Sequence, residues 1–199
     1  LGNALSLLNS NSNVSTVQLT SSASLSVSEG SFTATQITSK LGSVLGSTGA
    51  AIADGAVTVT SVVGSDALTI AANSKVGTVV LSASQTVNLS ATDLASSGAD
   101  IHAQLEKLSA TNSPTITLSG LQVDLDNLAT LGISGSNDAT YLASLKSYYH
   151  VNTLAFSSSD TFTYDDAKAI ADAGIVVTGS PKVSLDGKDS IFLADNASS

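Results

Sequence analysis

Residues 76–89 read VGTVVLSASQTVNL, with apolar and hydroxyl-bearing side chains alternating on both sides of a Ser-rich centre. Alternation with a period of two is typical of a strand that buries one face. The Ser-rich centre is typical of a turn. The stretch therefore predicts a strand, a turn and a second strand.

Two other stretches align with this one without gaps. They are VSTVQLTSSASLSV at residues 14–27 and VNTLAFSSSDTFTY at residues 151–164. A shorter version of the first arm begins at Thr78, Thr115, Thr153 and Ser190, in steps of 37, 38 and 37 residues. A constant interval of this size is typical of repeat architectures, in which each unit buries its apolar face against the next.

Helical spacing of apolar residues follows most of the copies. The segments expected to be helical are 34–45, 97–108, 124–131, 138–149 and 165–173. Ser97 with Asp100, and Thr163 with Asp166, are expected to cap two of them, and Gly174 is expected to close the last. Before the second copy, residues 56–63 and 67–71 are expected to be strands, joined by a hairpin turn at 64–66.

A strand–strand–helix order implies parallel strands, because the chain returns through a helix before each new strand. The predicted fold class is an α/β repeat: a β-rich solenoid of strand–strand–helix units, with parallel strands and short helices on one side. We expect an irregular, β-rich capping part at residues 1–75 and repeat units of about 37 residues at 76–199, in one continuous domain.

Composition excludes several classes of function. The chain has 199 residues, a net charge of −9 and no Cys, and its seven basic residues are all Lys. Without a basic cluster, binding to nucleic acid or to anionic lipid is not expected. No apolar run reaches the ~18 residues of a transmembrane helix. Ser and Thr together number 57, so the surface is expected to carry hydroxyls in place of charges.

The chain resembles the repeat modules of large secreted bacterial proteins, namely haemagglutinin-like or RTX-type adhesins and surface-layer-like proteins. Three stretches carry the resemblance: SSGADIHAQLEKL at 96–108, ITLS at 116–119 and TFTYDDAKAIA at 161–171. The lack of Cys, Met, Trp and Arg is also similar to that of exported bacterial surface proteins. The resemblance implies export, a surface or matrix role and, in some members, calcium; it implies no catalytic residue.

Candidate metal ligands are Asp186 and Asp189, in a stretch (184–191) that resembles one turn of a Gly- and Asp-rich calcium repeat. Calcium takes oxygen ligands of this kind, so calcium is the cofactor that this stretch would bind. The interpretation we favour is an ordinary Asp-Gly turn between two strands, without a cofactor. Two other Asp pairs, 124 with 126 and 165 with 166, are interpreted as helix caps in preference to ligands.

Tyr148, Tyr149 and His150 form a cluster of residue types that can ligate haem iron. The interpretation we favour is the end of an amphipathic helix, where a His suits the C-terminal dipole. The sequence contains no nucleophile elbow, phosphate-binding Gly loop or zinc-protease motif, so we expect no enzymatic activity.

The function expected from the sequence is that of an extracellular structural or adhesive module at the bacterial cell surface. Open strand edges favour self-association, and other surface proteins or carbohydrate are further expected partners. The alternative is a ligand-binding protein for calcium, sugar or haem without catalysis.

Overall fold

The computed structural model describes residues 1–109, 114–120 and 138–184. The chain forms two compact bodies. Body 1 contains residues 1–87 and 102–114, and body 2 contains residues 88–101 and the described part of 115–199. Each body is considered by itself below.

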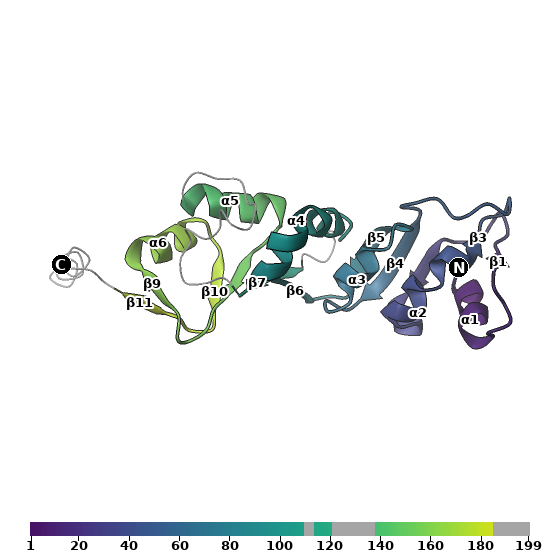
Figure 1. Cartoon of the computed structure of the whole chain (residues 1–199), viewed down its shortest axis with the longest axis horizontal. Coiled ribbons are helices and arrows are strands. Elements are labelled where there is room, and N and C mark those ends of the chain that lie inside the picture. Colours follow the sequence, from purple (N-terminus) through teal and green to yellow (C-terminus); the bar gives the residue numbers. More distant parts are fainter. Residues whose placement is uncertain (110–113, 121–137, 185–199) are drawn as a thin grey trace. The chain divides into compact units, whose positions relative to one another are not determined.

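One order of elements recurs along the described chain: a helix, a first strand and a second strand. Repeats 1 to 3 are α1 (Gly2–Ser10), β1 (Val17–Gln18) and β2 (Ser26–Ser28); α2 (Ala34–Thr38), β3 (Val44–Leu45) and β4 (Val57–Val62); and α3 (Ala67–Ala71), β5 (Val76–Leu81) and β6 (Thr86–Ser90). Repeats 4 to 6 are α4 (Ala91–Leu105), an isolated bridge at Leu108 and β7 (Thr115–Ser119); α5 (Asp138–Tyr148), β8 (Thr153–Ala155) and β9 (Thr161–Thr163); and α6 (Tyr164–Asp172), β10 (Val176–Thr178) and β11 (Lys182–Ser184). Figure 1 shows this succession along the ribbon.

Body 1 contains a parallel sheet in the order β2-β4-β5. Val27 lies beside Val59, and Val59 lies beside Val79. The sheet continues to Leu108, because the Val79 amide donates to the Lys107 carbonyl and the Ser109 amide to the Val79 carbonyl, both at 2.8 Å. A separate parallel pair joins β1 to β3 through Val17 and Val44.

Body 2 contains β10, β8 and β7 and, from Asn88 onward, β6, which form a sheet in the order β10-β8-β7-β6. Its strands pair in parallel where the register is defined, with Leu118 beside Leu154 and Leu154 beside Val177. A second parallel pair joins β9 to β11 through Phe162 and Val183. The prediction of an α/β fold with parallel strands and short helices is therefore confirmed.

The predicted 37-residue alignment does not describe the pairing. Leu154 lies beside Leu118, two residues beyond the Ile116 that the alignment matched to it. Val79 lies in the other sheet, between Val59 and Leu108. The reason is that the connections between paired strands differ in length from one repeat to the next. The copy at 190–193 lies outside the described residues.

The core consists of aliphatic side chains at equivalent places in adjacent strands. Val59 and Val79 in body 1, and Leu118 and Leu154 in body 2, are completely buried. Fully burying a Val or Leu side chain contributes about 1.5–3 kcal/mol to folding, so each strand depends on the neighbour that covers it. None of the helices in the described part of the chain has the length and apolarity needed to cross a membrane.

Helix C-termini are capped by side chains from other repeats. The Lys107 ammonium donates to the carbonyl of Ala71, the last residue of α3, at 2.6 Å. The Asn73 amide donates to the carbonyl of Thr38, the last residue of α2, at 3.0 Å. In body 2 the Lys146 ammonium donates to the Ala173 carbonyl at the end of α6, at 2.8 Å. These contacts satisfy carbonyls that a helix leaves without internal partners, and the lysines also complement the negative end of the helix dipole.

Three local predictions are wrong. Residues 67–71 form the helix α3 instead of a strand, because Ala67, Ile70 and Ala71 are buried together at helical spacing; the expected hairpin at 64–66 is therefore absent. The helix expected at 34–45 ends at Thr38, and a 3₁₀ turn (Leu41–Ser43) and β3 follow. α4 consists of two helical segments that meet at Ser97, whose dihedrals are non-helical. The second segment is the helix expected from 97, and it ends at Leu105; the first segment, which starts at Ala91, was not expected. At the start of the first segment the Ser90 hydroxyl accepts from the Asp93 amide at 3.1 Å.

The expected caps of the last helix are confirmed, and α6 lies one residue before the expected range of 165–173. Thr163 and Asp166 form a capping box at the start of α6. Gly174 takes a left-handed conformation after its end, with a φ of +63°. Ser84, in the turn between β5 and β6, has a similar φ of +59° without being glycine.

Ser84 and Gly174 give a matched pair of predictions. A left-handed conformation costs a residue with a Cβ about 1–2 kcal/mol, and glycine recovers most of this cost, less its own entropy of about 0.5–1 kcal/mol. We therefore expect Ser84→Gly to raise the free energy of unfolding by roughly 0.5–1 kcal/mol. We expect Gly174→Ala to lower it by at least as much, and urea denaturation measures both. Equal effects of the same sign would contradict the assignment of strain.

Candidate functional site

An open hollow of about 410 Å³ lies in body 1 where repeats 1 to 3 meet. It is formed by the 3₁₀ turn Glu29–Ser31, the start of α2, the end of β4 and the residue before α3. Its lining residues are Glu29, Gly30, Ser31, Phe32, Thr33, Gln36, Ser61, Val63 and Asp66. We call it the Glu29 hollow.

The Glu29 hollow is held open by a break in strand pairing. The register between β4 and β5 shifts between Val59 and Val62. Ser61, inside this shift, has a left-handed φ of +58°. The bulge turns the chain outward, and Val63 is 42% exposed. β-Bulges are common beside functional sites because they redirect side chains.

Glu29 takes the place of a strand partner at this break. Its Oε2 accepts a hydrogen bond from the Val63 amide at 2.8 Å. Burial and a hydrogen bond with the Asp66 side chain raise the pKa of Glu29 from 4.5 to about 7, although the Val63 amide opposes the shift. Near neutral pH the Glu29 carboxyl therefore carries a proton about half of the time.

Asp66 completes what we call the carboxyl pair. It precedes α3, without a side-chain hydrogen bond to the amides of that helix. When Glu29 is protonated, the pair can both donate a hydrogen bond and accept several. Phe32 and the Thr33–Gln36 capping box stand at the same hollow. The hollow therefore combines an aromatic residue with polar groups, as a site for a small polar ligand can.

The predicted site residues lie elsewhere. Asp186 and Asp189 lie outside the described residues, as does the Asp124 and Asp126 pair. Asp166 is buried and accepts from the Thr163 amide at 3.2 Å and from the Thr163 hydroxyl at 2.7 Å. Its interpretation as a helix cap is confirmed.

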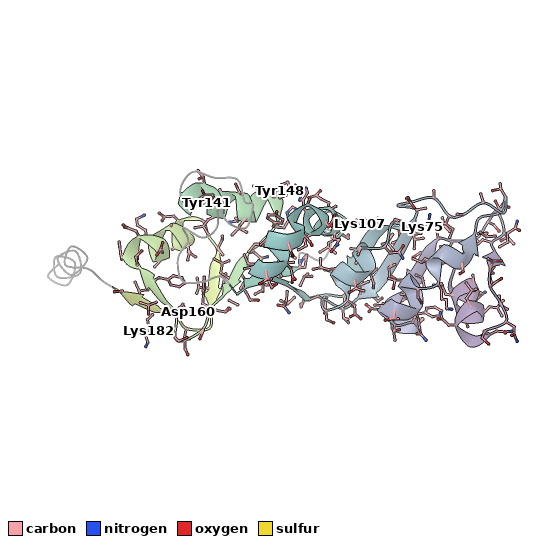
Figure 2. All side chains as sticks on the ribbon, viewed as in Figure 1. Lys75, Lys107, Tyr141, Tyr148, Asp160 and Lys182 are labelled. Carbon is pink, nitrogen blue, oxygen red and sulfur yellow. The ribbon has the colours of Figure 1, made fainter. Side chains whose placement is uncertain are left out.

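The Tyr148–His150 cluster lies at the end of α5. The rings of Tyr148 and Tyr149 meet edge to face with centroids 4.9 Å apart. Tyr149 is buried, which raises its pKa, whereas Tyr148 is exposed on α5 (Figure 2). His150 is left-handed with a φ of +55°, and the Val151 amide reaches back to the Leu145 carbonyl at 3.2 Å. His150 thus occupies the left-handed closing position usually given to glycine, in agreement with the helix-end interpretation.

Among residues 1–109, 114–120 and 138–184, there is no group of three or more His, Cys, Asp or Glu residues that could hold a metal ion. Calcium binding at Asp186 and Asp189 stays a prediction from the sequence.

The sequence analysis did not find the carboxyl pair. Glu29 and Asp66 are far apart along the chain, and no motif joins them. The pattern predicts a hairpin turn at Asp66, because the apolar run at 67–71 is too short to separate a helix from a strand. The one signal in the sequence is the rarity of Glu, which occurs only at 29 and 106.

The raised pKa of Glu29 predicts a pH dependence of stability. A carboxyl whose pKa is higher in the folded than in the unfolded state stabilises the fold when it is protonated, so its contribution is lost as pH rises from about 4.5 through about 7. We expect the free energy of unfolding to fall across this range, and Glu29→Gln to flatten the profile. The measurement is urea denaturation at a series of pH values.

Asp54→Asn is the matched control for that series. Lys75, whose ammonium lies 2.8 Å from Asp54 Oδ1, lowers the pKa of Asp54, so the contribution of Asp54 changes only at more acidic pH. This variant should therefore keep the slope between pH 4.5 and 7. A Glu29→Gln variant that also kept it would contradict the assignment.

Comparisons with protein-family models, with curated proteins and with solved structures found no match to this chain.

Proposed function

We propose that the chain is an extracellular structural or adhesive module of a bacterial surface protein, and that its repeats form a β/α solenoid. The observation that carries this proposal is the recurrence of helix, strand and strand, with parallel pairing between repeats. Such units cannot bury their apolar faces alone, and stacks of them are used as scaffolds and extended binding surfaces.

The composition supports an extracellular location. The surface is rich in Ser and Thr, and only 12% of the residues are charged. The resemblance of 96–108, 116–119 and 161–171 to repeat modules of secreted adhesins and surface-layer-like proteins points the same way. The partners we propose are further copies of the chain, other surface proteins or carbohydrate. We propose no catalytic activity.

Antibody labelling of cells that naturally produce the protein tests the location. We expect a purified antibody to label intact cells as strongly as permeabilised cells, because a surface protein is accessible without permeabilisation. Labelling of permeabilised cells alone would refute a surface role. An antibody to a cytoplasmic protein of the same cells is the control for leakage.

The second candidate function is ligand binding without catalysis, and the Glu29 hollow favours a sugar. Carboxyl groups that accept and donate hydrogen bonds suit sugar hydroxyls, and the aromatic residue Phe32 lines the same hollow. Calcium and haem are the other proposed ligands, with Asp186 and Asp189 for calcium and the Tyr148–His150 cluster for haem. Their support is the residue types in the sequence.

Titration calorimetry with a panel of neutral sugars tests the second candidate. We expect saturable heat with one class of sugar, reduced at least tenfold in affinity by Asp66→Asn, because a hydrogen bond to a charged group is worth about 1.5–3 kcal/mol. Asp93→Asn, on an exposed helix start, is the control and should bind as the wild type does. Flat titrations with every sugar would exclude a sugar site, and calcium chloride and haemin form separate arms.

A further inference from the structure

Helix α3 starts without the side-chain cap that α2 and α6 have. The Thr33 hydroxyl accepts from the Gln36 amide at 3.2 Å at the start of α2, and the Thr163 hydroxyl accepts from the Asp166 amide at 3.1 Å at the start of α6. Asp66 precedes α3 at the equivalent position, yet its side chain makes no hydrogen bond to that helix. Asp is among the residue types that cap helices best, so another contact must hold the Asp66 carboxyl.

The Asp66 carboxyl is held by Glu29. The two side chains share a hydrogen bond, which together with burial raises the pKa of Glu29 to about 7. The backbone of Asp66 is helical, with a φ of −101° and a ψ of −9°, whereas a capping residue is typically extended. The Asp66 amide also closes a turn by donating to the Val63 carbonyl at 3.0 Å. The bond to Glu29 therefore goes together with a turn that keeps Asp66 from capping α3.

Ionisation of Glu29 removes this bond, because a carboxylate has no proton to donate. It also leaves two like charges close together, and these repel each other. Glu29 and Asp66 are the only titratable residues that line the Glu29 hollow. The neighbouring segments 29–38, 57–71 and 81–87, which form the 3₁₀ turn and α2, β4 and α3, and the turn after β5, contain no other charged residue. With no cation to offset the repulsion, one of the two carboxylates has to move.

The contacts favour Glu29 as the carboxylate that stays. Glu29 Oε2 accepts from the Val63 amide at 2.8 Å, and this bond favours the ionised carboxyl. Asp66 has an alternative partner close by, because the first amides of a helix have no partner within it. A cap side chain bonds to the amide of the second or third helical residue, and in α3 these residues are Leu68 and Thr69.

We propose that Asp66 is a pH-sensitive switch between two partners. In the first position, seen in the structure, the Asp66 carboxylate accepts a hydrogen bond from the protonated Glu29 carboxyl. In the second position Glu29 is ionised and keeps its bond with the Val63 amide. Asp66 then adopts the extended conformation and accepts from the amides of Leu68 and Thr69. Both positions give the Asp66 carboxylate a partner, so the turn before α3 has two discrete arrangements whose populations depend on pH.

The switch also changes the Glu29 hollow. In the second position the hollow keeps one carboxylate, Glu29, and it loses the hydrogen-bond donor that the protonated pair supplies. This consequence rests on the sugar binding proposed above: a sugar bonded to both carboxyls should be released as pH rises through about 7. The measurements below use the protein without a ligand, so they can succeed even when every sugar titration is flat.

Two-dimensional ¹H–¹⁵N spectra of the full chain, recorded from about pH 5 to about pH 9, test the switch. We expect the Leu68 and Thr69 amide protons to move downfield as pH rises, because they become donors to a carboxylate. The midpoint of this change should coincide with that of the Glu29 carboxyl carbon, near 7. The Asp166 amide, which is already capped by Thr163, is the internal control and should keep its position.

Two substitutions of Glu29 should have opposite effects. Gln is neutral at every pH and can donate a hydrogen bond to Asp66, so Glu29→Gln should hold the Leu68 and Thr69 signals at their low-pH positions throughout. Ala has no group to hold Asp66, so Glu29→Ala should place the same signals at their high-pH positions throughout. Asp66→Ala is the matched control for the charge alone, since Glu29 still ionises but the two amides gain no acceptor and should not move downfield.

Hydrogen exchange of the wild type is the second measurement and needs no substitution. A cap bond slows the exchange of the amide that donates it. The protection factor of the Leu68 or Thr69 amide should therefore rise roughly fivefold between about pH 6 and about pH 8, which is the equivalent of ~1 kcal/mol. Two results would overturn the proposal: Leu68 and Thr69 amides that neither shift nor gain protection while Glu29 titrates, or the same amide positions in Glu29→Gln and Glu29→Ala.

Discussion

The fold depends on one contact: an aliphatic side chain in each strand lies against its counterpart in the adjacent parallel strand. In body 1 this row runs through Val27, Val59 and Val79, and in body 2 through Leu118 and Leu154. Parallel strands cannot be joined by a tight turn, so a crossover must separate them. The helices are those crossovers, and some are only five residues long. A helix this short is not stable by itself, which means that its stability comes from the strands and helices on which it packs. No repeat is therefore a folding unit alone.

Polar contacts also make each repeat depend on an adjacent repeat. The carbonyls at the end of α2, α3 and α6 are capped by Asn73, Lys107 and Lys146, none of which belongs to the helix that it caps. Of the six lysines in the part of the chain that the structure describes, four lie in contacts of this kind or in ion pairs: Lys75 with Asp54, Lys168 with Asp172, and Lys107 and Lys146 with helix ends. Of these contacts, the capping ones carry more weight, because exposed ion pairs contribute little in water. A chain with so few charges thus uses its lysines partly to join one repeat to the next.

The sequence was sufficient where the local pattern and the tertiary contacts agree. The strands of 76–89 and 151–164, the cap at Thr163 and the turn at Gly174 were all predicted, because alternation, capping and left-handed glycine are local properties. The sequence was insufficient where packing decides. Residues 67–71 have an apolar run too short to separate helix from strand by period, and burial of Ala67, Ile70 and Ala71 on one side selects the helix. The constant interval of 37 was misleading, because Val79 pairs with residues 20 before it and 29 after it.

The carboxyl pair shows why the candidate site was beyond the reach of pattern reasoning. Its geometry follows from a departure from the repeat, the register shift between Val59 and Val62. At that shift the Val63 amide bonds to the Glu29 carboxylate, and the turn that follows carries Asp66 toward the same carboxyl. A regular strand would have satisfied the amide with a carbonyl, and Glu29 would have kept an ordinary pKa in water. Side chains at the regular strand positions of this chain are packed against their neighbours. The side chains that remain available to bind a ligand or exchange a proton are those at irregular positions, such as the register shift in β4. That reasoning makes the bulge of β4, more than any Asp-rich motif, the part of body 1 to examine for a ligand.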